Sequence, residues 1–280
     1  MGFVINNNLA ANNTYRSLNN TQNDLSKSLE KLSTGLRINR AGDDAAGLSI
    51  SEGLKSQVTG SAQAARNAQD GISLLQTAEG GLTEAHSILQ RVRDLAVQAG
   101  NDSNNTQART AISTEVLALG KELERIGNAT NFNTIKLIDG TASALTFQVG
   151  TGSVAANDQI AVDLTTANVT SIGTAVQTLA AAGFATAAAA GATLTAIDGH
   201  INTVSTSRST IGATQNRLEH TIKSLNIAGE NLQAAQSRIA DVDMASEMVK
   251  FTKANILSQA GTAMLAQANQ SSQGVLSLLR

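Results

Sequence analysis

A stripe of apolar residues spaced three and four apart between positions 194 and 239 constrains the fold more than any other feature. Its members are Leu194, Ile197, Ile201, Val204, Arg208, Ile211, Gln215, Leu218, Ile222, Leu225, Gly229, Leu232, Gln236 and Ile239. This spacing is typical of a coiled-coil helix, in which one stripe faces a partner. A continuous helix over the stretch would be roughly 70 Å long. Because such a helix is not stable alone in water, the sequence predicts partner helices.

Three further stretches show the same spacing and are the expected partners. Their stripes are Ala11, Tyr15, Leu18, Gln22, Leu25, Leu29, Leu32 and Leu36; Leu75, Ala78, Leu82, Ala85, Leu89, Val92, Ala96 and Ala99; and Ile112, Val116, Leu119, Leu123 and Ile126. The polar residues 100–105 between the last two stripes predict an antiparallel helical hairpin. Residues 35–44 combine glycines with Asn, Asp and Arg, which indicates an irregular connector. A separate, shorter helix is expected after it, over 45–60.

The chain closes with another amphipathic stretch after residue 243. Neither this stretch nor residues 1–45 has enough large apolar side chains to offset the conformational entropy of ordering it alone. We therefore expect both segments to be largely disordered in the isolated chain and to order against copies of themselves, as in an assembly subunit. The side chains expected in that self-assembly core are Leu18, Leu25, Leu29, Leu32, Leu36, Met248, Phe251, Ile256, Leu257, Met264, Leu276 and Leu279.

Residues 132–164 change from helical to alternating spacing, which predicts a small β region. Asp139-Gly140 lies between apolar runs and predicts the hairpin turn. Residues 166–193 are rich in Ala, Thr and Gly, with a short helix expected at 174–182. The expected fold is mainly α: a long antiparallel helical coiled-coil rod with paired terminal helices and a small β-hairpin region.

Two domains are expected. Residues 1–45 and 240–280 form a terminal-helix domain, and residues 46–239 form the rod with a short variable region at about 141–193. The expected rod core consists of Leu75, Leu82, Leu89, Ile112, Val116, Leu119, Leu123, Ile197, Ile201, Ile211, Leu218, Ile222, Leu225 and Leu232.

Composition excludes several functional classes. A net charge of −2 argues against a nucleic-acid partner, whose binding depends on neutralising phosphates. The chain has no cysteine for a thiolate metal site, and its three histidines are far apart, so no cofactor is expected. The first residues lack the basic and apolar segments of a secretory signal, and no stretch reaches membrane-span length, so no membrane contact is expected. Ser28-Leu-Glu-Lys31 matches Ser-x-x-Lys without its partner motifs, which leaves no candidate catalytic residue.

Several blocks resemble those of one known family. The segment LSTGLRINRAGDDAAGL at 32–48 closely resembles the amino-terminal signature of bacterial flagellins. Further similar blocks are NAQDGIS at 67–73, QRVRDLAVQ at 90–98, NFN at 131–133, SRIADVDMA at 237–245, AQAN at 266–269 and VLSLLR at 275–280. They keep the family's order and cover residues 1–140 and 194–280. The chain resembles a short flagellin that lacks large outer domains.

This resemblance implies a structural subunit that self-assembles into the flagellar filament for swimming motility. In flagellins the terminal helices form the inner tube, and the subunits leave the cell unfolded through the flagellar type III apparatus. The implied location is therefore extracellular, in the flagellum. The implied partners are copies of the chain itself, an export chaperone that binds 240–280, and the cap and hook-associated proteins.

The resemblance also implies a surface site on the rod. The residues that a vertebrate Toll-like receptor reads in many flagellins fall on Arg91, Leu95 and Glu115, with Gln90 beside them. Where many relatives have Arg-Glu-Leu, this chain has Arg93-Asp94-Leu95, a small departure. The preferred interpretation of the same residues is an axial contact with the next subunit.

Alternatives remain at this stage. A hook–filament junction protein shares the helical termini and would form a short ring. A secreted coiled-coil adhesin or translocator would need a membrane-active helix that the chain lacks, and an enzyme is the least favoured class. Arg208, Gln215, Gly229 and Gln236 interrupt the main stripe and either fix its register or let protofilaments slide between states.

Overall fold

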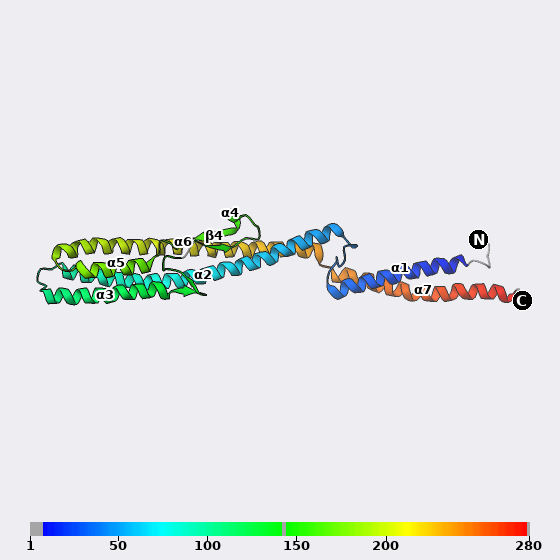
Figure 1. Cartoon of the computed structure of the whole chain (residues 1–280). Coiled ribbons are helices and arrows are strands. Elements are labelled where there is room, and N and C mark those ends of the chain that lie inside the picture. Colours follow the sequence, from blue (N-terminus) through cyan, green and yellow to red (C-terminus); the bar gives the residue numbers. More distant parts are fainter. Residues whose placement is uncertain (1–7, 142–143, 279–280) are drawn as a thin grey trace. The chain divides into compact units, whose positions relative to one another are not determined.

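The protein is mainly α-helical within residues 8–141 and 144–278, which the computed structural model describes (Figure 1). The helices are α1 (Leu9–Thr34), α2 (Ala45–Ala99), α3 (Thr106–Ala129), α4 (Ala155–Asp158), α5 (Val169–Ala182), α6 (Ala187–Ala240) and α7 (Met244–Leu278). The strands are β1 (Asn131–Phe132), β2 (Ile135–Lys136), β3 (Leu145–Gln148) and β4 (Gln159–Val162). The predicted fold class is confirmed: long helices dominate, and the strands form only two short antiparallel pairs.

The expected separate helix over 45–60 is wrong, because α2 runs without interruption from Ala45 to Ala99. Gly60 lies inside this helix and does not end it. A Cβ placed at Gly60 would lie 2.9 Å from Cγ2 of Thr151. Another segment of the chain therefore approaches the helix closely at this point, and only glycine leaves room for it. This explains why a residue of low helix propensity lies in the helix interior.

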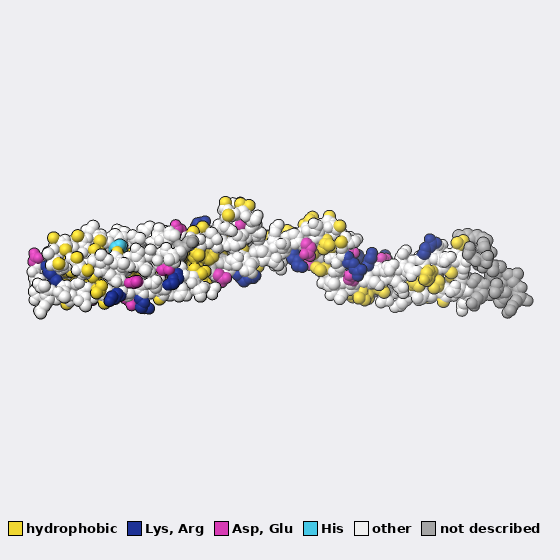
Figure 2. Space-filling model, in the orientation of Figure 1, with side chains coloured by type: hydrophobic (Ala, Val, Ile, Leu, Met, Phe, Trp, Pro, Cys, Tyr) yellow, Lys and Arg dark blue, Asp and Glu magenta, His cyan; other side chains and the backbone are white. Residues whose placement is uncertain are grey.

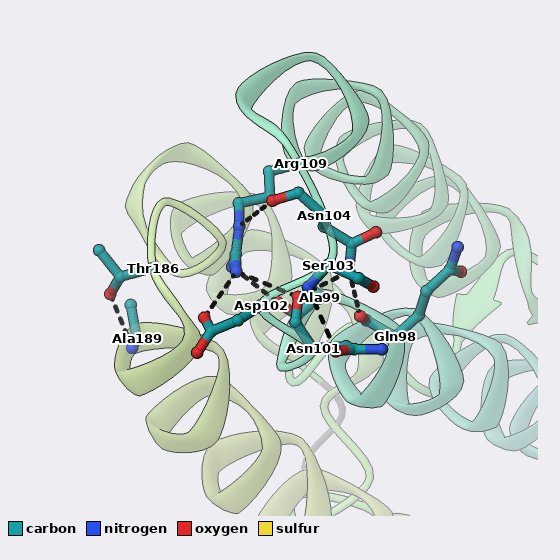
Figure 3. Close-up of polar contacts among 9 residues, drawn as sticks. All are labelled: Gln98, Ala99, Asn101, Asp102, Ser103, Asn104, Arg109, Thr186 and Ala189. Carbon is teal, nitrogen blue, oxygen red and sulfur yellow. Dashed lines mark hydrogen bonds and ion pairs between the residues drawn. The ribbon is translucent and has the colours of Figure 1, made fainter.

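The predicted antiparallel hairpin of α2 and α3 is present, and the side chain of Arg109 ties its turn together (Figure 3). Its guanidinium donates to the carbonyl oxygens of Ala99 at 2.7 Å, Asn101 at 3.2 Å and Asn104 at 3.3 Å. It also lies 3.5 Å from the carboxylate of Asp102. A cation thus satisfies carbonyls at the carboxyl end of a helix, where the helix dipole favours positive charge.

The β region forms, but its hairpin turn is not the predicted one. β1 and β2 pair antiparallel with Phe132 opposite Ile135, so Asn133 and Thr134 make the turn, both with positive φ. Asp139 instead closes a local turn, because its carboxylate accepts hydrogen bonds from the backbone N–H and hydroxyl of Thr141. β3 pairs with β4, and the single turn of α4 precedes β4.

The packing divides into two compact units, residues 1–57 with 230–280 and residues 58–229. The division falls inside α2 and α6, whereas the predicted domain boundaries fall at 45 and 240. The predicted domains concern positions in an assembled filament, so they stay a prediction.

In the unit of residues 58–229, α2, α3 and α6 share one apolar core with the intervening region. Of the predicted rod core, the buried side chains are Leu75, Leu82, Leu89, Ile112, Val116, Leu123, Ile197, Ile211 and Leu218. Leu119, Ile201, Ile222 and Leu225 are only half-buried, and so is Leu232 in the other unit. Burial therefore decreases along the last turns of α6.

Residues 141–193, which were expected to form a short variable region, contribute several buried side chains to this core. Phe184, Leu164 and Val176 are fully or almost fully buried. α5 begins at Val169, earlier than the predicted helix, and packs against α3. The backbones approach closely there, since a Cβ at Gly173 would lie 2.7 Å from the backbone nitrogen of Glu124.

Candidate functional site

In the unit of residues 1–57 and 230–280, α1 and α7 pack antiparallel along a narrow seam. Asn8 donates to the carbonyl of Ala268 at one end, and Ser28 donates to Glu247 toward the other. Near the middle, Leu18 packs against Gly261. The α7 side of the seam is made of small or polar residues with few large apolar ones; its buried or half-buried members are Glu247, Phe251, Ala254, Ser258, Gly261, Leu265 and Ala268.

The base of this pair is fixed by backbone contacts between the segments that follow α1 and precede α7. Leu36 and Asp241 form an isolated antiparallel bridge, and the backbone N–H of Val242 donates to the carbonyl of Gly35. Gly35 ends α1 in the left-handed conformation that glycine adopts readily. The Arg37 guanidinium donates to the carbonyl of Ile239 at 2.8 Å. These contacts hold the segment that follows α1 against the segment that precedes α7.

Most large apolar side chains of α7 point away from the seam and remain exposed. Met248 is 48% exposed, Ile256 is 60% exposed and Met264 is 61% exposed. A shallow groove of about 450 Å³ on this face is lined by Met248, Val249, Thr252, Lys253, Ile256 and Leu257. Figure 2 shows hydrophobic patches on the surface of this helix pair. An apolar surface of this kind marks an interaction site more often than a free surface.

The predicted self-assembly residues divide between these two faces. Leu18, Leu25, Leu32 and Phe251 are half-buried along the helix pair. Those more than a third exposed are Leu29, Leu36, Met248, Ile256, Leu257 and Met264. The side chain of Leu276 and the whole of Leu279 lie outside the described part of the structure.

Ser28 and Glu247 are functional candidates that the sequence reasoning missed. Both are buried, and the Ser28 hydroxyl donates to Oε1 of Glu247 at 2.7 Å. Nζ of Lys250 lies 3.0 Å from Oε2 of the same carboxylate. Burial acts to raise the pKa of Glu247, but the hydrogen bonds from Ser28 and Lys250 and the charges of Lys250 and Lys31 outweigh it and lower that pKa. The signal that could have found Glu247 is its place in the three–four spacing through 251, 254, 258 and 261.

The predicted rod-surface site lies on α2 and α3, and three of its four residues are exposed. Arg91 binds Glu115 through two hydrogen bonds to Oε1, from Nη2 at 2.7 Å and from Nε at 3.0 Å. Gln90 contacts His86 one turn earlier. Leu95 is only 2% exposed, so its assignment to this contact surface is corrected. Its side chain belongs to the hydrophobic core cluster of this unit instead.

Two of the polar residues in the main stripe meet one carboxylate of α2. The Glu79 carboxylate lies 3.8 Å from Nη2 of Arg208 and accepts a hydrogen bond from Gln215 at 3.4 Å. A polar layer therefore interrupts the apolar packing between α2 and α6. Both the register and the sliding interpretations of these residues stay open.

Within the described residues, no group of three or more His, Cys, Asp or Glu side chains is arranged to hold a metal ion. None of the described helices combines the length and apolar character needed to cross a membrane. The exposed surfaces described above are the apolar faces of α1 and α7 and the polar patch on α2 and α3.

Long heptad helices with a terminal pair that leaves its apolar face uncovered define a structural subunit that associates through helices. Comparison with known proteins identifies which one. The bacterial flagellin N-terminal helical region matches residues 5–143, and the bacterial flagellin C-terminal helical region matches residues 194–279. The chain therefore belongs to the bacterial flagellin family, whose members are structural subunits of the flagellar filament and not enzymes.

Two flagellins of similar length support this assignment. A flagellin of Halalkalibacterium halodurans is 54% identical over 277 residues, covering 99% of this chain and 100% of that protein. A flagellin of Bacillus subtilis is 49% identical over 305 residues, covering 99% of each. The crystal structure of Bacillus cereus flagellin aligns with 57% of this chain and 88% of its own at 30% identity, with a TM-score of 0.47. This chain is a short form without large outer domains.

Proposed function

We propose that the protein polymerises with copies of itself through the outward apolar faces of α1 and α7, which form the inner core of the filament. One observation carries the proposal: α7 turns mostly small and polar residues toward α1 and leaves Met248, Ile256, Leu257 and Met264 uncovered. Burying such side chains contributes about 1.5–3 kcal/mol each. Neighbouring subunits with the same faces can supply that burial.

Electron microscopy after seeding with short filament fragments tests this. The double variant Ile256→Asp with Leu257→Asp places charge on the outward face and is expected to form no filaments. The matched control, Ile256→Leu with Leu257→Ile, changes the same two residues but keeps the face apolar, and it is expected to assemble. Circular dichroism verifies that both variants keep the parental helix content. Filaments from the first variant, or from a chain that lacks 240–280, would show that the remaining helices assemble without this face.

The alternative role as a hook–filament junction protein is distinguished by the same images. Polymerisation of the purified chain into long tubes supports the filament role. Short rings that do not elongate would instead favour the role of a hook–filament junction protein.

We further propose that the chain leaves the cell unfolded through the flagellar type III apparatus and works outside the cell. Support comes from the absence of proline and cysteine, which removes slow peptide-bond isomerisation and disulfide formation from refolding. Residues 240–280 are the proposed binding segment for an export chaperone, and the cap and hook-associated proteins are further proposed partners. The test measures the protein in culture medium with and without a functional export apparatus; equal amounts would contradict the route.

The patch of Gln90, Arg91 and Glu115 is proposed first as an axial contact between subunits and second as the site read by a host Toll-like receptor. Its support is the exposed ion pair of Arg91 and Glu115. Arg91→Ala with Glu115→Ala is expected to shorten filaments and to reduce the response of receptor-expressing reporter cells. Unchanged filaments with a lost receptor response would leave only the second role.

A further inference from the structure

One of the two lines of α7 residues in the α1–α7 seam is chemically repetitive, so its packing does not specify one register. The line of α7 residues seven apart contains Glu247, Ala254, Gly261 and Ala268. Leu18 packs against Gly261, and a slip of seven residues would replace that glycine by Ala254 or Ala268. These residues are all small, so the apolar contacts change little between the registers. Glu247 is the only charged residue among these four.

We infer that the buried Ser28–Glu247 hydrogen bond selects the register in which α1 pairs with α7. In the observed register the Glu247 carboxylate receives both the Ser28 hydroxyl and the ammonium of Lys250. The groove beside it carries four lysines, Lys27, Lys31, Lys250 and Lys253, against the two carboxylates of Glu247 and Asp24, so its net charge is positive. A single buried polar pair in a coiled-coil seam is the best-documented device for fixing register.

Slipped registers lose this partner, and they also break the backbone contacts of Leu36 with Asp241 and of Gly35 with Val242 at the base of the pair. A slip in one direction brings Glu247 opposite Thr21, whose hydroxyl already donates to the carbonyl of Ser17. A slip in the other direction brings it opposite Gly35, which has no side chain and ends α1. In either case the buried carboxylate keeps Lys250 of its own helix but loses the Ser28 hydrogen bond, and the loss of a hydrogen bond to a buried charged group is disfavoured.

A register role differs from a stabilising role in a measurable way. Replacing a buried polar pair by apolar residues of similar volume is often neutral or stabilising. The double variant Ser28→Ala with Glu247→Leu is therefore expected to keep or raise the midpoint of thermal unfolding while it loses the single register. A pair that merely stabilised the helices would lower that midpoint.

Because the chain contains no cysteine, introduced cysteine pairs report the register directly. A Cβ at position 261 would lie 3.8 Å from Cβ of Leu18, which matches the spacing of about 3.8 Å in disulfides. Leu18→Cys with Gly261→Cys reports the observed register. Leu18→Cys with Ala254→Cys, and Leu18→Cys with Ala268→Cys, report the slipped ones. Each pair is placed in the full-length chain and oxidised both before and after seeded assembly.

The parental chain is expected to oxidise only in the 18–261 pair. In the Ser28→Ala, Glu247→Leu background, the ratio of the 18–261 product to the slipped products is expected to fall about tenfold or more, in line with loss of a charged buried hydrogen bond. As the matched control, Gln259→Ala removes an exposed hydrogen bond to Asn255 and is expected to leave the ratio unchanged.

Exclusive 18–261 oxidation in the Ser28→Ala, Glu247→Leu background overturns the inference, and so does absence of the 18–261 product in the parental chain. The inference rests on the proposed assembly only for its consequence in the filament. Cross-linking measures the register, whereas electron microscopy measures polymerisation, so failure of either is distinguished from failure of the other.

Discussion

At the residue scale, Glu247 links the pairing of α1 and α7 to pH. Its pKa is lowered from the usual value of 4.5 because the hydrogen bonds and charges of its neighbours outweigh the effect of burial. A group with a depressed pKa in the folded state contributes stability that is present above its unfolded pKa. That contribution is lost as the pH falls through the folded pKa.

We therefore expect the α1–α7 pair to loosen as the pH falls below about 4.5, the usual glutamate value. The measurement is amide exchange of α1 and α7 across this pH range in the full-length chain. Glu247→Gln keeps a side chain of the same size without a titratable carboxyl, so its exchange should vary less with pH. Identical pH profiles for the two chains would rule out this role of Glu247.

A second prediction at this scale concerns Arg109, whose side chain is only 11% exposed where it ties the α2–α3 turn. Arg109→Ala leaves the carbonyl of Ala99 without its donor and is expected to cost about 1.5–3 kcal/mol in the free energy of unfolding. Arg125→Ala removes an exposed pair with Glu122 and is expected to cost under about 1 kcal/mol. Denaturant titration of both variants gives the comparison. Equal losses of unfolding free energy would contradict the role of Arg109 in stabilising the α2–α3 turn.

At the element scale, the sequence predicted helices wherever a heptad stripe was long and missed what depends on contacts between distant segments. The stripe at 194–239 and the hairpin of α2 and α3 follow directly from spacing. Gly60 was interpreted as a helix end because its contact with Thr151 is invisible in the local pattern. The start of α5 at Val169 likewise depends on its packing against α3.

The contact between α3 and α5 gives a prediction with an internal control. Gly173→Ala places a methyl group against the backbone of α3 and is expected to destabilise the protein by about 1–3 kcal/mol, the usual cost of overpacking. Gly199→Ala, in α6, meets no atom within 4 Å and is expected to stabilise by about 0.5–1 kcal/mol. Thermal unfolding measures both, and a neutral Gly173→Ala would show that α5 does not pack this closely.

At the scale of the whole molecule, the site was only half predictable from the sequence. Spacing placed Met248, Ile256 and Leu257 in the self-assembly set, and they are exposed in this structure, while their role in assembly stays a prediction. Spacing alone did not separate the face of α7 toward α1 from its exposed face. The buried Glu247 was missed because a charged residue does not count toward an apolar stripe.

The two units also differ in how much of their own core they contain. Among the described residues, the buried apolar side chains of the unit of residues 1–57 and 230–280 are Ile38, Ala240 and Ala254, whereas residues 58–229 hold the large core of leucines, isoleucines and valines. Ordering a residue costs about 1–2 kcal/mol in backbone entropy, which so little burial does not offset. We therefore expect the first unit to depend on contacts from other subunits.

We expect amide hydrogens of α1 and α7 to exchange much faster than those of α3 and the buried part of α2 in the isolated chain. In assembled filaments the exchange of α1 and α7 should slow to the rate of the rod helices, because neighbouring subunits then cover Met248, Ile256 and Met264. Hydrogen exchange with mass spectrometry on both forms measures this. The Ile256→Asp, Leu257→Asp variant serves as the unassembled reference under filament conditions. Full protection of α1 and α7 in the isolated chain would mean that the pair completes its own core, and the drive for assembly would then have to come from the rod surface around Arg91 and Glu115.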